Sequence, residues 1–182
     1  MSRSLRIIQV IMKIARVISL ILFILAIIGA IATIAGAVVT FVIPFESYEI
    51  DGINLKDYFE SEFGFTIVEV GCALIIGAVS AVAEVFTVKI IHNYLTREIN
   101  DGTPFTLEGA KHLRRSALIC FLISLGSVII SSILHEIFVS RGMMTSDYDL
   151  MNAINVAWYL LLLFLSVVFQ YGAEQSSNRI NE

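Results

Sequence analysis

The sequence predicts an all-α polytopic membrane protein, a bundle of four transmembrane helices with both termini in the cytoplasm. The 182 residues are 57% hydrophobic and only 15% charged, with a mean hydropathy of +0.84. A soluble domain of this size could not bury so much apolar surface. Four stretches are long and apolar enough to cross a hydrocarbon core of ~30 Å, which takes about 20 residues of helix. Lys and Arg lie almost entirely on one side of these stretches.

One membrane domain covering residues 1–182 accounts for the whole sequence. Its first stretch, Val17–Ile43, has 27 residues without a formal charge. This is too long for the apolar region of about 7–15 residues in a cleaved signal peptide. The other stretches are Phe65–Ile91, Ser116–Leu134 and Leu150–Ala173. The expected helices span about 15–43, 65–92, 114–138 and 150–172, with outer loops at 44–64 and 139–149 and a cytoplasmic loop at 93–113.

The distribution of basic residues predicts the orientation of the chain. Lys and Arg near the ends of spans are retained on the cytoplasmic side of a membrane. With both termini inside, ten of the twelve Lys and Arg residues lie in the cytoplasm, and Lys56 and Arg141 lie outside. The sequence therefore predicts a multi-pass protein of the cytoplasmic (inner) membrane.

Small residues predict the faces through which the helices pack, because lipid provides no hydrophobic drive for helix association and close backbone approach takes its place. The first three stretches carry such residues at helical spacing, whereas the fourth is bulky on all sides. We therefore expect the first three helices to pack closely and the fourth to be more exposed to lipid. The small residues are Ala32 and Gly36 in the first stretch, Ala73, Gly77 and Ala81 in the second, and Cys120, Ser124, Ser127 and Ser131 in the third.

The outer loop combines a turn signal with many acids. Asp51-Gly52 between short alternating runs is typical of a hairpin turn, although an isolated two-stranded hairpin is marginal in water. The six acids of the loop could collect a divalent cation, but their spacing does not match a calcium-binding loop. A solvated acidic surface is the favoured interpretation, so the sequence predicts no metal site and no cofactor here.

The cytoplasmic connection should be structured. Residues Asn93–Asn100 continue the second helix beyond the membrane, Asp101–Pro104 favours a turn, and Thr106 is placed to cap the third helix. Basic side chains then lie at the level of the inner headgroups, where each attracts anionic lipid by ~1 kcal/mol. They are predicted to bind membrane lipids or an acidic partner, or only to set the topology. These residues are Arg97, Lys111, Arg114 and Arg115.

Three features together resemble a known family. The segment Asp101–Thr106 is followed by the basic run Lys111–Arg115, and the last helix ends in Phe169–Ala173. This arrangement is similar to an uncharacterised family of small four-helix bacterial membrane proteins with a Gly-x-Pro-Phe loop between helices two and three. The resemblance implies a bacterial membrane protein, and members are often encoded beside a helix-turn-helix regulator. The chain departs from the family after Ala173, where the usual acidic tail keeps only Glu174.

Glu84 is the ionisable residue placed well within a span. It lies about 8–12 Å from the inner end of the second helix and follows Gly77 by seven residues, which puts it on the face of the small residues. Ionisable residues at this depth are costly and often functional. Glu84 therefore serves a proton relay, a cation site or a charge-dependent switch, or it only links helices by a hydrogen bond. Its expected partners at the same level are Cys120, Ser124, Ser166 and Gln170.

No catalytic constellation is evident in the sequence. It lacks a Gly-rich phosphate loop and a nucleophile elbow, and His135-Glu136 is not followed by the second histidine of a helical zinc motif. We expect no enzyme activity, no cofactor and no direct binding of nucleic acid. The favoured function is a regulatory or interaction protein whose cytoplasmic face contacts a partner, such as a helix-turn-helix protein. The alternative is a small transporter or channel that acts as a homo-oligomer with Glu84 in the pathway.

Overall fold

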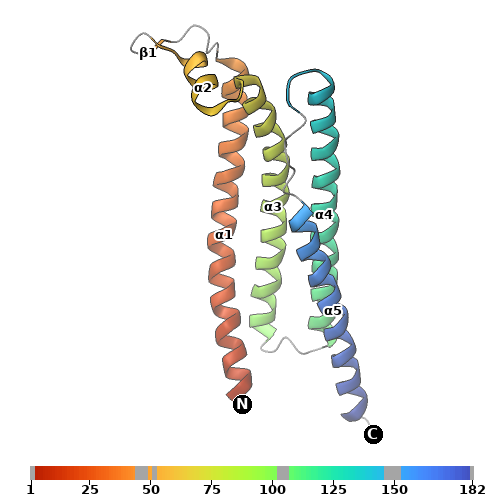
Figure 1. Ribbon diagram of the computed structural model, residues 1–182. Coiled ribbons are helices and arrows are strands. Elements are labelled where there is room, and N and C mark those ends of the chain that lie inside the picture. The colour runs from red at the N-terminus through yellow and green to blue at the C-terminus, as the bar shows by residue number, and fades with distance from the viewer. Residues whose placement is uncertain (1–2, 44–48, 51–52, 102–106, 146–152, 181–182) are drawn as a thin grey trace.

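The computed structural model describes residues 3–43, 49–50, 53–101, 107–145 and 153–180 of the chain. Four long helices dominate it, and a hairpin and a short helix lie at one end (Figure 1). The prediction of a predominantly helical fold is confirmed. The elements in chain order are α1 (Arg3–Val42), β1 (Glu49–Ile50), β2 (Ile53–Asn54), α2 (Leu55–Phe63), α3 (Ile67–Asp101), α4 (Leu107–Ser140) and α5 (Ala153–Ile180).

Three of the helices are long and apolar enough to cross a membrane. Within the described residues these spans are Gln9–Val42, Ile67–Asn100 and Glu108–Ser140. Many of their large apolar side chains are exposed on the surface of the protein. Such exposure is typical of helices covered by lipid and unusual for helices in water. The protein is therefore a multi-pass membrane protein. The apolar part of α5, Trp158–Gly172, is shorter than the three spans.

The four long helices form an open row in the order α1, α3, α4, α5. In Figure 1, α5 begins beside the middle of α4, and the free ends of α1 and α5 lie at the same end of the row. The expectation that the first three helices pack on one another is wrong in one respect. Among the described elements, α1 makes its extended contact with α3, and α4 occupies the other side of α3. Because α1 and α4 contact opposite sides of α3, the helices form a row and not a closed bundle.

The contact between α1 and α3 is close at one end and polar near the other. A Cβ atom added at Gly71 of α3 would come within 2.7 Å of Thr40 Oγ1, and one added at Gly36 of α1 would come within 3.1 Å of a facing leucine. Towards the opposite end, Ser19 Oγ lies 2.9 Å from His92 Nδ1. Small residues thus allow the backbones to approach, and a hydrogen bond links them further along.

The small-residue faces are partly those expected. On α1, Ala30 and Ala37 are buried, whereas Ala32 is exposed. The prediction for Ala32 is wrong because α1 carries small residues on more than one side, and spacing alone does not say which side meets α3. On α4 the expected face is confirmed. Its buried residues are Cys120, Ser124, Ser127 and Ser131.

The segment between α1 and α3 contains the predicted hairpin. β1 and β2 pair antiparallel, with Glu49 opposite Asn54 and Ile50 opposite Ile53. The hairpin is therefore confirmed, while its Asp51-Gly52 turn lies outside the described residues.

A short helix, α2, follows the hairpin inside the segment that was expected to be loop. The Asn54 side chain caps its start by accepting a hydrogen bond of 2.9 Å from the Lys56 backbone N–H. Gly64 ends it with a φ of 70°, a left-handed conformation that glycine adopts without steric cost. Both end signals were present in the sequence, but nine residues gave too short a pattern to predict a helix.

The two ends of α3 follow from different local signals. At its start, Glu69 Oε2 accepts from the Thr66 backbone N–H at 2.8 Å, and Thr66 Oγ1 accepts from the Glu69 backbone N–H at 3.2 Å. This capping box explains an acid inside an expected span. At its other end α3 reaches Asp101, so the predicted extension through Asn93–Asn100 is confirmed. The remainder of the predicted turn and the predicted cap Thr106 lie outside the described residues.

Candidate functional site

A polar pocket lies where α3, α4 and α5 meet. It has a volume of about 20 Å³, which is room for about one water molecule. Polar side chains in an apolar surrounding are expected to gather, because lipid offers them no hydrogen bonds. The polar residues that line the pocket are Ser80, Glu84, Thr87, Ser124, Ser127 and Tyr159.

Glu84 lies at the edge of this pocket and is exposed. In the described part of the chain its carboxylate makes no hydrogen bond. Glu84 follows Gly77 by seven residues and so lies on the same side of α3. The expectation that this side points into a closed bundle is wrong, because a Cβ at Gly77 would meet Thr33 of α1 at 4.0 Å, while the exposed Glu84 borders α4 and α5. Since α1 and α4 pack on opposite sides of α3, Glu84 lies on the flank between them.

Two of the expected partners lie at or near the pocket. Ser124 of α4 lines it beside Glu84. Cys120 is buried one helical turn away, and its Sγ lies 4.0 Å from the backbone carbonyl oxygen of Thr87. The depth estimated from the sequence therefore placed Ser124 and Cys120 at the correct level of α4.

The two expected partners on α5 make other contacts. Ser166 is fully buried, but it donates to the Leu163 carbonyl oxygen of its own helix at 2.6 Å. Gln170 accepts a hydrogen bond of 3.2 Å from Arg114 at the end of α4. Both predictions assumed that α5 runs level with α4, whereas α5 begins beside its middle (Figure 1).

Sequence reasoning missed residues that complete the pocket. Thr87 follows Ser80 by seven residues and Glu84 by three, so helical spacing alone placed them on one side of α3. Tyr159 comes from α5 and lines the pocket together with Thr87 and Glu84. No sequence signal pointed to Tyr159, because its position depends on how far α5 is shifted along α4.

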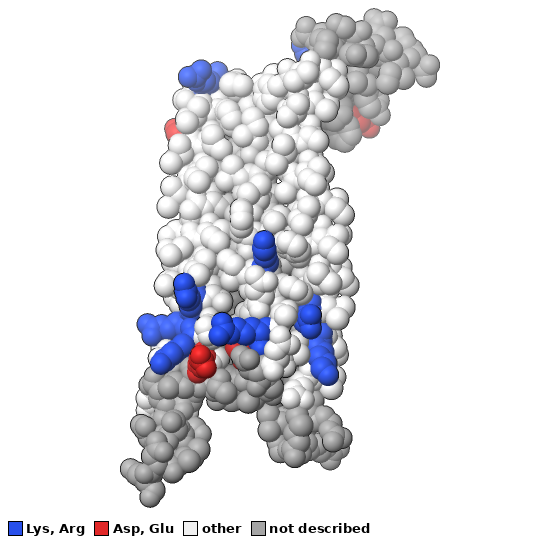
Figure 2. Space-filling view, turned by 180° about the vertical axis from the view of Figure 1, so that it is seen from behind, with Lys and Arg blue, Asp and Glu red and all other residues white. Residues whose placement is uncertain are grey.

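The predicted basic residues Arg97, Lys111, Arg114 and Arg115 are all exposed, at the ends of α3 and α4 that adjoin the connection between these two helices. They do not all face the same way. Arg114 turns towards α5 through its bond to Gln170, and Arg115 points about 100° away around the same helix. Figure 2 shows Lys and Arg gathered in a band towards this end of the molecule, with a white stretch between the band and the charged residues at the opposite end.

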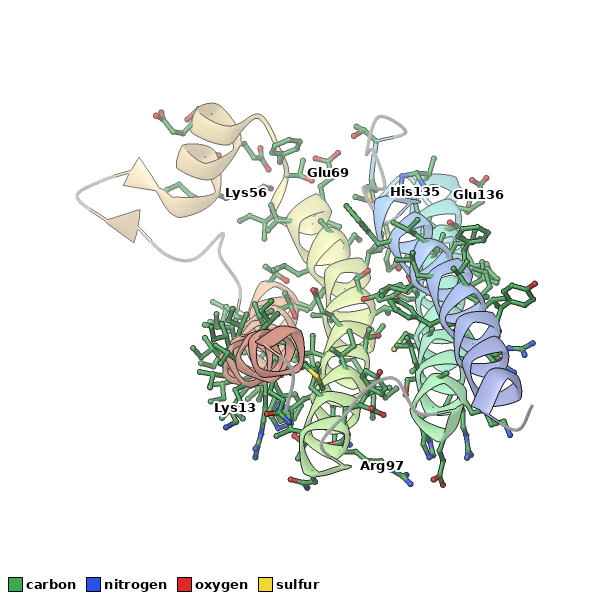
Figure 3. The ribbon with its side chains drawn as sticks, turned by 90° about the horizontal axis from the view of Figure 1, so that it is seen from below. Lys13, Lys56, Glu69, Arg97, His135 and Glu136 are labelled. Carbon is green, nitrogen blue, oxygen red and sulfur yellow. The ribbon has the colours of Figure 1, made fainter. Side chains whose placement is uncertain are left out.

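A buried carboxylate, Glu98, was not among the expected site residues. It is only 1% exposed, and it lines a cavity of about 240 Å³ with Gln9 and Lys13 of α1. Lys13 precedes Ser19 by six residues and Glu98 follows His92 by six, so the antiparallel Ser19–His92 contact brings them to one level. In Figure 3, Lys13 and Arg97 lie towards the same end of the molecule, apart from Glu69, His135 and Glu136.

Two further features bear on this site: groups of metal-binding side chains and similarity of the chain to known proteins. Within the residues that the structure describes, no group of three or more His, Cys, Asp or Glu side chains could hold a metal ion. Comparison of the chain with protein-family models, with curated proteins and with solved structures finds no match.

Proposed function

We propose that this protein is a non-enzymatic membrane interaction module whose basic cytoplasmic face docks an acidic surface of a regulatory protein. The observation that carries the proposal is the set of exposed cations at one end of the row, to which α1, α3 and α4 all contribute. The backbone of packed helix ends is already ordered, so only the side chains lose freedom on binding, and complementary charge steers association. The cations are Lys13, Arg16, Arg97, Lys111, Arg114 and Arg115.

A fourth membrane crossing and cytoplasmic termini belong to the same proposal. Large apolar side chains of α5, including Trp158, Phe164 and Phe169, are exposed, and lipid is the solvent that covers such side chains without cost. The exposed cations lie at the same end of the row as the free ends of α1 and α5 (Figures 1 and 2). Because Lys and Arg are retained inside, this end is assigned to the cytoplasm.

Cysteine labelling tests the crossing and the orientation together. On a background in which Cys72 and Cys120 are replaced by Ala, single cysteines replace Thr145 or Ser177. A membrane-impermeant maleimide is expected to label Thr145→Cys in intact cells and Ser177→Cys only after the membrane is opened. Labelling of both cysteines in intact cells would overturn the fourth crossing, and labelling of Ser177→Cys alone would overturn the assigned orientation.

Charge reversal at the basic face tests docking. Arg114→Glu with Arg115→Glu is expected to lower recovery of a partner co-purified in mild detergent at least about tenfold, because juxtaposed like charges repel strongly. Arg141→Glu at the opposite end of α4 is the matched control and should leave recovery unchanged. Labelling at Thr145 and Ser177 is repeated in the reversed variant. Altered topology would mean that these charges only orient the chain, and unchanged recovery with unchanged topology would remove the docking proposal.

The polar pocket favours a second candidate, a small transporter or channel that acts as a homo-oligomer. Its support is the carboxylate of Glu84 among hydroxyl groups of α3, α4 and α5. In a row of helices, a second copy packed against the open flank would enclose Glu84 and give it the partners that a monomer lacks.

The second candidate predicts a dependence on charge at position 84. If Glu84 carries protons or cations, Glu84→Gln should abolish flux through reconstituted protein in vesicles with a pH- or cation-sensitive dye, and Glu84→Asp should retain it. Glu136→Gln, an exposed acid at the other end of α4, is the control. Absence of flux in the unsubstituted protein, or equal flux with Gln and Glu, rules this candidate out.

A further inference from the structure

An apolar groove of about 650 Å³ lies between α1 and α4, with α3 as its floor. It backs onto the polar pocket across Ala83 and Ser127, which line both. A Cβ atom added at Gly126, in its wall, would meet nothing within 4 Å, so the groove is open there. Its other lining residues include Ile34 and Val38 of α1, Val79 and Val82 of α3, and Leu122 of α4.

Two cations lie below this groove on the same side of their helices. Lys89 follows Val82 by seven residues on α3, and Arg115 precedes Leu122 by seven on α4, so each lies two turns from the groove and in line with it. Both side chains are exposed. The Cys120–Thr87 contact fixes the antiparallel register of α3 and α4, which places the two Cα atoms within about 5 Å of the same height.

The distance between cations and groove matches one leaflet of a bilayer. Half of a hydrocarbon core of ~30 Å is about 15 Å, which corresponds to about ten residues of helix. Ten residues from Lys89 towards the groove lead to Val79, in its floor. A phosphate group held at the height of Lys89 therefore has its acyl chain alongside the groove.

The charge around this position is complementary to an anion. Arg16 of α1 and Arg97 of α3 are exposed further towards the same end, and the exposed acid Glu108 of α4 lies towards that end as well. Glu108 precedes Arg115 by seven residues, so it lies about 10 Å further from the groove. Figure 2 shows Lys and Arg across the lower part of the molecule, with a white stretch between them and the charged residues at the opposite end.

We infer that the groove binds an anionic phospholipid, with an acyl chain between α1 and α4 and its phosphate at Lys89 and Arg115. The inference does not depend on a protein partner and stands apart from the proposed docking function. Each basic residue at headgroup level contributes about fivefold to the affinity for anionic lipid. The groove adds selectivity by shape. An open apolar recess beside a phosphate site can hold a lipid acyl chain, whereas a flat helix surface cannot.

Lipid retention by the purified full-length protein tests the headgroup site. The protein in mild detergent is titrated with phosphatidylglycerol or with phosphatidylcholine of identical acyl chains, and bound lipid is counted by native mass spectrometry. We expect preferential retention of phosphatidylglycerol. Lys89→Gln with Arg115→Gln should weaken its binding about 25-fold, whereas Arg114→Gln, the neighbouring cation turned towards α5, should not. Equal loss with Arg114→Gln would show that only net charge matters and would overturn the site.

A filled groove tests the acyl-chain site. Gly126→Leu is expected to abolish retention while leaving the melting temperature unchanged, because its side chain enters open space. Gly29→Leu on α1, where an added Cβ also meets nothing within 4 Å, is the matched control outside the groove and should retain lipid. Equal retention of both lipids by the unsubstituted protein would reduce the groove to ordinary boundary lipid and overturn the inference. A dimer that Gly126→Leu separates would overturn it too, because the groove would then hold a second copy of the chain.

Discussion

Glu98→Lys is expected to lower the free energy of unfolding by about 3–5 kcal/mol, the usual cost of an uncompensated buried charge. The Glu98 side chain is 1% exposed, and Lys13 lines the same cavity. The substitution therefore places an ammonium group in a buried position, beside a cavity that the exposed cation Lys13 also lines. The loss should appear as separation of α1 from α3 at the ends that carry Lys13 and Glu98.

Unfolding by increasing SDS in mixed micelles, followed by circular dichroism, measures this effect. Glu108→Lys at an exposed position of α4 is the matched control and should change stability by less than about 1 kcal/mol. Combining Glu98→Lys with Lys13→Glu restores opposite charges and should recover most of the loss. If Glu98→Lys is as stable as the unsubstituted protein, Glu98 and Lys13 do not share a buried site.

The membrane spans were predictable because their signal is local and strong. Val17–Ile43 is uncharged throughout. A stretch of this length and apolarity is stable in lipid whatever the neighbouring helices are. The same locality explains why the hairpin at Glu49–Asn54 was found from its turn dipeptide. The helix that follows it needed only an Asn cap and a terminal Gly, which are weak signals over nine residues.

The packing of the helices was predictable only in part, because it depends on which sides of each helix find a neighbour. Spacing correctly grouped Ser124 with Ser127 on one side of α4. It could not show that α3 is packed on two opposite sides, and this is why the side that carries Gly77 and Glu84 was expected to point into a closed bundle. Tyr159 lies at the pocket because α5 is shifted along α4. The periodicity of the sequence does not predict how large this shift is.

Glu98 shows how one known contact between two helices fixes which of their other residues lie at the same level. From the sequence, Asn93–Asn100 is a polar extension whose acid should face water. Once Ser19 is known to meet His92, antiparallel register brings Lys13 to the level of Glu98, and the acid becomes part of an interface. The extension is therefore polar for two reasons: one side meets solvent, and the other side lines a polar cavity with Gln9 and Lys13 of α1.

Gly71 is expected to be the position of α3 least tolerant of a larger residue. A Cβ atom there would come within 2.7 Å of Thr40 Oγ1 and 2.8 Å of Phe41 Cε2. The Phe41 ring can shift, but the Thr40 hydroxyl donates to the Ala37 carbonyl oxygen at 2.8 Å, so it gives way only by losing that bond. Gly71→Ala should therefore cost about 1–3 kcal/mol through overpacking, and Gly71→Leu should prevent the close approach of α1 and α3.

The sign of the effect separates crowding from helix propensity. Gly→Ala within a helix otherwise gains up to about 1 kcal/mol, so Gly126→Ala, whose Cβ meets open space, should be neutral or stabilising in the same SDS titration. Thr40→Ala removes the nearest atom, and in the Gly71→Ala background it should restore part of the loss. A stabilising Gly71→Ala would mean that the backbones of α1 and α3 lie further apart than this contact requires, since added bulk at a true close approach cannot be accommodated without moving one helix.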